Sequence, residues 1–277
     1  MQPNPVPAVR KGYVDTRGGQ IHYRHAEPWA GRAAPVLFFH RTPVSSASFE
    51  RVLACLAGWR PLVAFDTPGF GESFTPPDAM AMADFTEAFA EAIASLGVEH
   101  CHLVGHHTGC HFATELAVQL GQRVLSLMID GAMVSSAEER ARVTPGAAAP
   151  EIDRDGAYAR ATWSFLQPYY TVFDPRCVHD EFVGALRTTF TRGACMRAVQ
   201  AHDMSAALAR VRCPVLASAA GDDVFSLHLE RIRAVAPHAV LRRYGSAGIA
   251  APELQTGAFA DLVRESVGAG ESAAGIG

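Results

Sequence analysis

Short apolar runs alternate with amphipathic segments along most of this chain, and this alternation restricts its fold more than any other feature. Four runs, at residues 35–40, 60–66, 100–105 and 123–130, are almost continuously apolar, as expected of strands buried on both faces of a sheet. The segments between them have the spacing of helices with one apolar face. The pattern predicts an α/β fold with a mostly parallel, doubly wound sheet and right-handed crossovers.

The remaining segments predict how the chain is divided. An N-terminal hairpin over residues 12–26 belongs to the first part of an α/β core, for which we predict residues 1–133. Residues 134–210 are rich in aromatic side chains and proline and contain no buried strand, so we expect a helical lid inserted there. The core resumes over residues 211–268, and the Gly/Ala-rich residues 269–277 are predicted to be a flexible tail.

Composition excludes several classes of function. The chain has 277 residues, of which 49% are hydrophobic and 19% charged, and its formal net charge is −4. We therefore expect a globular protein that binds neither nucleic acid nor an anionic membrane. The N-terminus lacks the apolar core of a signal peptide, and no run could span a bilayer, so a cytoplasmic location is expected. The six cysteines show no metal-ligand spacing, and we expect no metal and no cofactor. The sequence does not indicate an oligomeric state.

A short motif between the third buried run and the next helix indicates where chemistry would take place. Gly105-His106-His107-Thr108-Gly109 has the Gly-x-residue-x-Gly spacing of a nucleophile elbow, a strand–turn–helix that normally presents a serine. Here the presented residue is His107. The motif is not a phosphate-binding loop, because no Gly-Lys-Ser/Thr follows.

Five segments in this order resemble the α/β-hydrolase superfamily, and the resemblance covers nearly the whole chain. Besides VGHHTGC at the elbow, FFHRTPVSSASF resembles the loop after that family's third strand, and FDTPGFGES resembles its Asp-x-Pro-Gly-x-Gly-x-Ser segment. PVLASAAGDDVF resembles the strand that leads to the catalytic acid, and YGSAGIAAPE resembles the loop that ordinarily carries the catalytic histidine. The resemblance implies an α/β-hydrolase fold with a helical lid.

The resemblance also implies which residues depart from the family's mechanism. In that mechanism a serine attacks, a histidine takes its proton and an acid orients the histidine. The acid maps to Asp223, but His107 stands at the serine position and Ile249 at the histidine position. No histidine follows His238, which lies at the wrong end of the sheet to serve. The sequence therefore argues against an acyl-enzyme formed by a Ser-His-Asp triad.

Other site residues follow from the same resemblance. The oxyanion hole would use the backbone N–H groups of Thr108 and Thr42. Arg41 replaces the family's loop glycine and, if it points inward, offers a cation to a carboxylate or enolate. We predict His40, Arg41, Asp130 and Trp163 as possible substrate-binding residues. Of these, His40 resembles a histidine that supports the loop, and Asp130 is a second acid that could orient His107.

Three interpretations of His107 remain open at this point. It is a general acid or base that titrates near neutral pH, a nucleophile that forms an acyl-imidazole, or a residue that fills a strained turn in a decayed site. We favour the first, in an enzyme that hydrolyses or otherwise converts (as lyase, cyclase or isomerase) a small apolar carbonyl or ester compound. The alternatives are a non-catalytic protein that binds a small ligand and a serine hydrolase that recruits Ser73 or Ser246.

Overall fold

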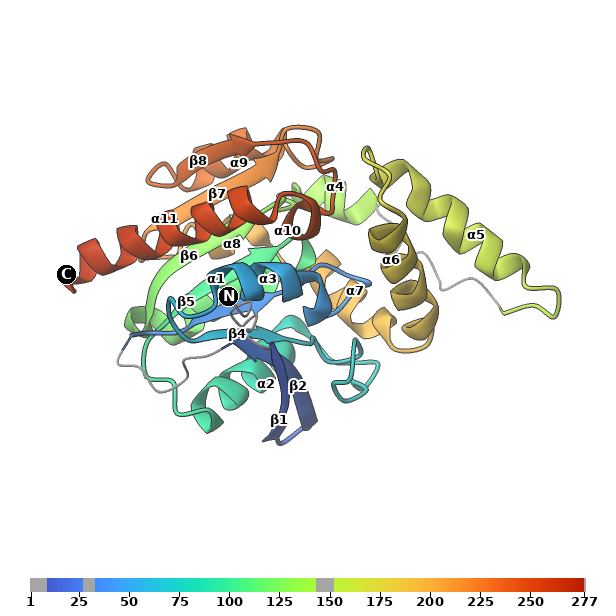
Figure 1. The fold of residues 1–277 in the computed structure, drawn as a ribbon, viewed down its shortest axis with the longest axis horizontal. Helices are drawn as coiled ribbons and strands as arrows, with labels where there is room; N and C mark the ends of the chain where they lie inside the picture. Colours follow the sequence, from blue (N-terminus) through green and yellow to red (C-terminus); the bar gives the residue numbers. More distant parts are fainter. Residues whose placement is uncertain (1–8, 27–32, 143–151, 277) are drawn as a thin grey trace, which may run out of the picture.

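A single eight-stranded sheet forms the centre of the molecule, and the computed structural model describes it within residues 9–26, 33–142 and 152–276 (Figure 1). The strand order is β1-β2-β4-β3-β5-β6-β7-β8, antiparallel for the two pairs that involve β2 and parallel elsewhere. The predicted mostly parallel α/β sheet is therefore confirmed. The strands are β1 Arg10–Thr16, β2 Gly19–Ala26, β3 Val36–Phe39, β4 Leu62–Phe65, β5 Cys101–His106, β6 Val124–Asp130, β7 Val215–Ala220 and β8 Val240–Tyr244.

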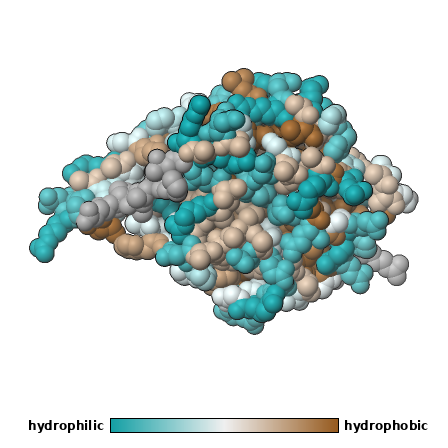
Figure 2. All heavy atoms as spheres, turned by 180° about the vertical axis from the view of Figure 1, so that it is seen from behind, coloured by the Kyte–Doolittle hydropathy of each residue, from teal (hydrophilic) through white to brown (hydrophobic). Residues whose placement is uncertain are grey.

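Helices cover both faces of this sheet, as the doubly wound pattern predicts. The α-helices of the described residues are α1 Glu50–Leu56, α2 Met82–Ser95, α3 Thr108–Leu120, α4 Ala137–Arg142, α5 Ala157–Leu166, α6 Pro175–Arg187, α7 Arg192–Ala201, α8 Met204–Leu208, α9 His228–Val235, α10 Ala251–Leu254 and α11 Thr256–Ala274. No helix in the described part of the chain has the length and hydrophobicity required to cross a membrane. Figure 2 shows hydrophobic residues interspersed with hydrophilic ones over the face turned away from the viewer in Figure 1.

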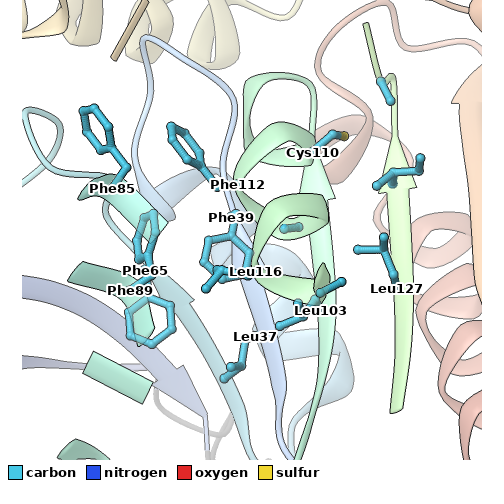
Figure 3. Packing of buried hydrophobic residues seen from close by; sticks show 14 of the residues in the cluster. Leu37, Phe39, Phe65, Phe85, Phe89, Leu103, Cys110, Phe112, Leu116 and Leu127 are labelled. Atoms are coloured by element: carbon cyan, nitrogen blue, oxygen red, sulfur yellow. The ribbon is translucent and has the colours of Figure 1, made fainter. Parts of the chain in front are cut away.

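The central strands are apolar throughout because successive side chains enter two different cores. In β3, Leu37 and Phe39 pack under α2 and α3, whereas Val36 and Phe38 pack under α1 and α11. Figure 3 shows the first of these cores, where the rings of Phe39, Phe65, Phe89 and Phe112 gather between the sheet and the helices. These two cores fix β5, β6 and β7 side by side, with their carboxyl ends at one edge of the sheet.

The segment predicted as the lid, residues 134–210, divides into two parts in the structure. Helices α5 and α6 pack against each other and stand apart from the sheet (Figure 1). Helices α7 and α8 instead contribute side chains such as Val199, Met204 and Leu208 to the core that contains α2 and α3. Within the described part of this segment, α5 and α6 thus project from the sheet, whereas α7 and α8 belong to the core.

The predicted flexible tail requires a correction, because α11 continues to Ala274. Gly270 is buried, and a Cβ atom at this position would lie 2.6 Å from the carbonyl oxygen of Leu125. The next residue, Glu271, forms an ion pair with Arg60 at 3.0 Å. Close contact with β6 and this ion pair hold a segment whose glycine content alone suggested a frayed end.

Candidate active site

His107 occupies a sharp turn between β5 and α3. Among the described residues it is the only one other than glycine with a positive φ, at φ 49° and ψ −113°. Its backbone N–H donates to the carbonyl of Asp130 at 2.9 Å. A Cβ atom at Gly109 would lie 1.9 Å from the carbonyl oxygen of Phe39, and one at Gly105 would lie 2.6 Å from the Cα of Cys110. The two glycines of the motif are thus required sterically, and the turn presents the imidazole above the sheet edge.

Asp223 lies within hydrogen-bond distance of this imidazole. His107 Nε2 is 2.7 Å from Asp223 Oδ2, and the backbone N–H of Phe225 donates to the other carboxylate oxygen at 2.7 Å. Because an ionised carboxylate only accepts, Nε2 carries the proton. Nδ1 forms no hydrogen bond with a described residue, and this atom is not completely buried. The arrangement leaves the Nδ1 lone pair for a reacting molecule.

The electrostatics of the pair favour a neutral base beside a charged acid. Burial lowers the pKa of His107, against the opposing charge of Asp223, and the neighbouring His106 lowers it further. Burial alone would raise the pKa of Asp223, but the charge and hydrogen bond of His107 outweigh it, so the net pKa is below the usual value. Near neutral pH the geometry therefore presents an unprotonated Nδ1 supported by a carboxylate.

Comparison with known proteins identifies the fold family in which this dyad stands. The family model for the alpha/beta hydrolase fold matches residues 34–223. The chain belongs to this family. It is 32% identical over 213 residues to a putative carbamate hydrolase, RutD, from Variovorax paradoxus, covering 73% of this chain and 78% of that protein. It is also 27% identical over 128 residues to a proline iminopeptidase from Heyndrickxia coagulans, which covers 46% of this chain but only 44% of that enzyme.

A solved structure supports the fold over almost the full length. The enol-lactonase from Burkholderia xenovorans LB400 superposes with a TM-score of 0.72 at 18% identity, covering 92% of this chain and 99% of that protein. At this identity the similarity concerns the fold alone. Several curated relatives bear the names of hydrolytic enzymes, among them an esterase/perhydrolase and a fluoroacetate dehalogenase. The α/β-hydrolase fold and a relationship to hydrolases are therefore established.

The backbone N–H of Thr42, which was predicted as an oxyanion-hole donor, already has a hydrogen-bond partner in the structure. It donates to the side-chain hydroxyl oxygen of Thr108 at 2.8 Å, so this donor is occupied. Thr108 begins α3, where the first backbone N–H groups have no partner within the helix. Its own N–H has no partner among the described residues, and the residue is partly exposed.

Arg41 does not offer a free cation to a substrate, contrary to the prediction for an inward-pointing guanidinium. Its Nε and one terminal nitrogen donate to Glu181 of α6 at 3.0 and 2.8 Å, and the other terminal nitrogen donates to Glu253 at 2.8 Å. Tyr170 donates to the same carboxylate oxygen of Glu181 at 3.0 Å. Arg41 is only 1% exposed. Its hydrogen bonds to Glu181 connect the loop after β3 to α6 of the lid.

His40 and Trp163 have contacts with other parts of the protein. His40 Nδ1 donates to the carbonyl of Arg41 at 2.7 Å, and its Nε2 accepts from the backbone N–H of Thr67 at 2.9 Å. Both nitrogens are thus used to support the loop, and burial lowers the pKa of the ring. Trp163 of α5 packs edge-on against Phe182, with the ring centres 5.3 Å apart, and is 38% exposed. Neither side chain has a contact that supports the predicted substrate-binding role.

Asp130 bonds to His106 and not to the side chain of His107. His106 Nδ1 is 2.9 Å from Asp130 Oδ2 and its Nε2 is 2.9 Å from the carbonyl oxygen of Ile249. The side chain of Ile249, which stands where the family has its histidine, is buried beside Tyr170. Asp223 is therefore the acid that orients His107.

Sequence reasoning missed one residue of the site entirely. Gly131 follows β6 with φ +61°, and a Cβ atom here would lie 2.5 Å from His107 Nε2 and 2.9 Å from Asp223 Oδ2. A glycine directly after a strand-ending acid was the available signal, but the prediction addressed only Asp130.

A groove of about 600 Å³ lies beyond the loop after β3, and its lining includes neither His107 nor Asp223. It runs between α1 and α6 and is lined by charged side chains such as Arg51, Arg176 and Asp180. The exposed fraction of His107 itself is 8%.

Proposed function

We propose that this α/β-hydrolase-fold protein is an enzyme that converts a small apolar ester or carbonyl compound with His107 as general base. The observation that carries the proposal is the His107–Asp223 dyad, with Nε2 held by the carboxylate at 2.7 Å and Nδ1 without a partner among the described residues. An imidazole so held moves protons near neutral pH without a further activating group.

For an ester, the steps follow from these contacts. Nδ1 takes a proton from water as the water oxygen attacks the carbonyl carbon, and Asp223 stabilises the resulting imidazolium. The N–H and hydroxyl of Thr108 bind the carbonyl oxygen as it becomes negative. His107 then returns the proton to the departing alkoxide. With a carbonyl substrate, the same nitrogen would instead remove a proton from the carbon next to the carbonyl group.

The surroundings of the two candidate serines argue against an alternative nucleophile. Ser73 Oγ donates to the carbonyl of Asp66 at 2.7 Å, and Ser246 Oγ donates to Asp222 at 2.5 Å. Neither hydroxyl bonds to a histidine ring that could take its proton. An apolar substrate is supported by the ring of Phe225, whose centre lies 5.3 Å from that of His107.

A second candidate function is non-catalytic binding of a small ligand on the same fold. The low exposure of His107 and its absence from the groove between α1 and α6 favour this alternative. It predicts ligand binding with no turnover.

Intact-protein mass spectrometry tests the proposal. A fluorophosphonate should leave the mass unchanged, and no acetyl adduct should accumulate while p-nitrophenyl acetate is hydrolysed. A stoichiometric fluorophosphonate adduct on a serine would contradict the mechanism. An acetyl group trapped on His107 would replace general-base catalysis by nucleophilic catalysis, and binding without hydrolysis would favour the second candidate.

A further inference from the structure

His106, the residue before the elbow histidine, is enclosed between two hydrogen-bond acceptors. Its exposed fraction is 0%. One ring nitrogen lies 2.9 Å from a carboxylate oxygen of Asp130, and the other lies 2.9 Å from the backbone carbonyl oxygen of Ile249. A neutral imidazole has one N–H and one lone pair, so one of these contacts would set a lone pair against an oxygen. If Asp130 is ionised, both contacts are favourable only when both nitrogens carry protons.

The surroundings of Asp130 favour the charged form of this carboxyl group. Its second oxygen accepts from the hydroxyl of Ser218 at 2.7 Å and from that of Tyr244 at 3.0 Å. Together with His106, three donors therefore converge on a carboxyl group that is 0% exposed. Several donors stabilise a buried carboxylate, and a buried charge requires a partner of opposite sign.

We propose that His106 is a buried imidazolium paired with Asp130, and that it serves as a positioning residue that keeps His107 in its neutral, proton-accepting form. The centres of the two imidazole rings are 4.5 Å apart. A fixed positive charge at this distance opposes a second proton on His107. The same imidazolium holds the 249 carbonyl, so it also fixes the loop from which the family's catalytic histidine is missing.

Other titratable groups face this pair from the neighbouring elements. Asp223 bonds to His107 from the loop after β7, while Tyr244 of β8 reaches Asp130. Cys110 of α3 donates through its Sγ to the backbone carbonyl of Asp130 at 3.3 Å, and burial raises the pKa of this thiol. His228 of α9 stands behind Phe225, with ring centres 5.3 Å apart. Of these groups, only Asp223 has an opposite charge in contact with the His107 ring, and it favours the Nε2 proton.

Long-range proton–nitrogen NMR of histidine-labelled protein tests the protonation state directly. The His107→Gln variant identifies the signals of residue 107, and His106→Gln those of residue 106. We expect both nitrogens of His106 to carry protons at about pH 7 in the wild-type chain. One unprotonated nitrogen at neutral pH would overturn the inference. In Asp130→Asn, which removes the carboxylate, His106 should lose one proton, and unchanged double protonation there would contradict the assigned ion pair.

The effect on His107 is measured in the same spectra. In His106→Gln, the pH midpoint of His107 protonation should rise by about one unit, since the positive charge is gone and the carboxylate of Asp130 remains. An unchanged midpoint would refute the role toward His107. If this variant fails to fold, the wild-type spectrum and Asp130→Asn still decide the protonation state.

The positioning role rests on the proposed function of His107, but the protonation of His106 does not. A His107→Gln variant that retained activity would remove the proposed function and leave the His106 spectrum as it is. A singly protonated His106 would remove this inference and leave the His107 kinetics as they are.

Discussion

Replacing Gly131 by alanine should disrupt the His107–Asp223 pair, because a Cβ atom there would lie 2.5 Å from two atoms of the imidazole and 2.9 Å from Asp223 Oδ2. Its φ of +61° adds backbone strain of about 1–2 kcal/mol. Loss of a hydrogen bond to a charged group costs about 1.5–3 kcal/mol more. We therefore expect Gly131→Ala to lower the free energy of unfolding by about 2.5–5 kcal/mol.

Gly121→Ala is the matched control, since Gly121 has a similar φ of +56° but nothing within 4 Å of the added carbon. It should carry only the strain of about 1–2 kcal/mol. Urea unfolding measures both variants, and NMR of the His107 Nε2 proton reports whether the bond to Asp223 survives. Equal stability of the two variants, with the Nε2 proton signal unchanged in Gly131→Ala, would refute the account of the site.

Three further predictions concern stability and the missing triad. Arg41→Met should lower the free energy of unfolding by about 3–5 kcal/mol, because the buried Glu181 loses its cation, and adding Glu181→Gln should recover part of this loss. Burial lowers the pKa of His102 and of His111 to about 3. As the pH falls, these two histidines are therefore protonated in the unfolded chain before they are protonated in the folded one. Below about pH 6.5, the free energy of unfolding should decrease by about 1.4 kcal/mol per pH unit for each of the two histidines. A free energy of unfolding in urea that stayed constant between about pH 6.5 and 5 would contradict this. The double substitution His107→Ser with Ile249→His should not restore efficient hydrolysis of p-nitrophenyl acetate, because the Thr42 N–H is occupied; restoration to the rate of a serine esterase would show that only the triad had changed.

The sheet and the elbow could be predicted from sequence because their signals are local. Strands buried on both faces are continuous apolar runs, and the elbow glycines are spaced by the steric demands of one turn. Asp223 could also be expected near His107, since both follow parallel strands whose carboxyl ends share one edge.

The parts that could not be predicted depend on contacts between distant segments. Arg41 meets Glu181 across 140 positions, and no periodicity relates the loop after β3 to one face of α6. The acceptor that completes His106 is a backbone carbonyl, which any residue at position 249 would supply. In the same way, contact with β6 extends α11 beyond the end that composition suggested.

The occupied donor of Thr42 shows a different limit. The resemblance implied two free backbone N–H groups, but the identity of residue 108 decides whether one of them is used internally. The hydroxyl oxygen of Thr108 lies 2.8 Å from the Thr42 backbone nitrogen and accepts its proton in a hydrogen bond. A side chain one position beyond the elbow thus decides whether the Thr42 N–H is free.

The central claim is that the His107 imidazole carries the proton, and it is tested most directly by kcat/KM for p-nitrophenyl acetate in His107→Gln. Glutamine can still donate to Asp223 but cannot exchange a proton near neutral pH. We predict a loss of about 10²–10⁴-fold relative to the wild-type chain, similar to that of His107→Ala. A His107→Gln variant within a few-fold of wild type, or a wild-type chain no faster than buffer, would contradict the account.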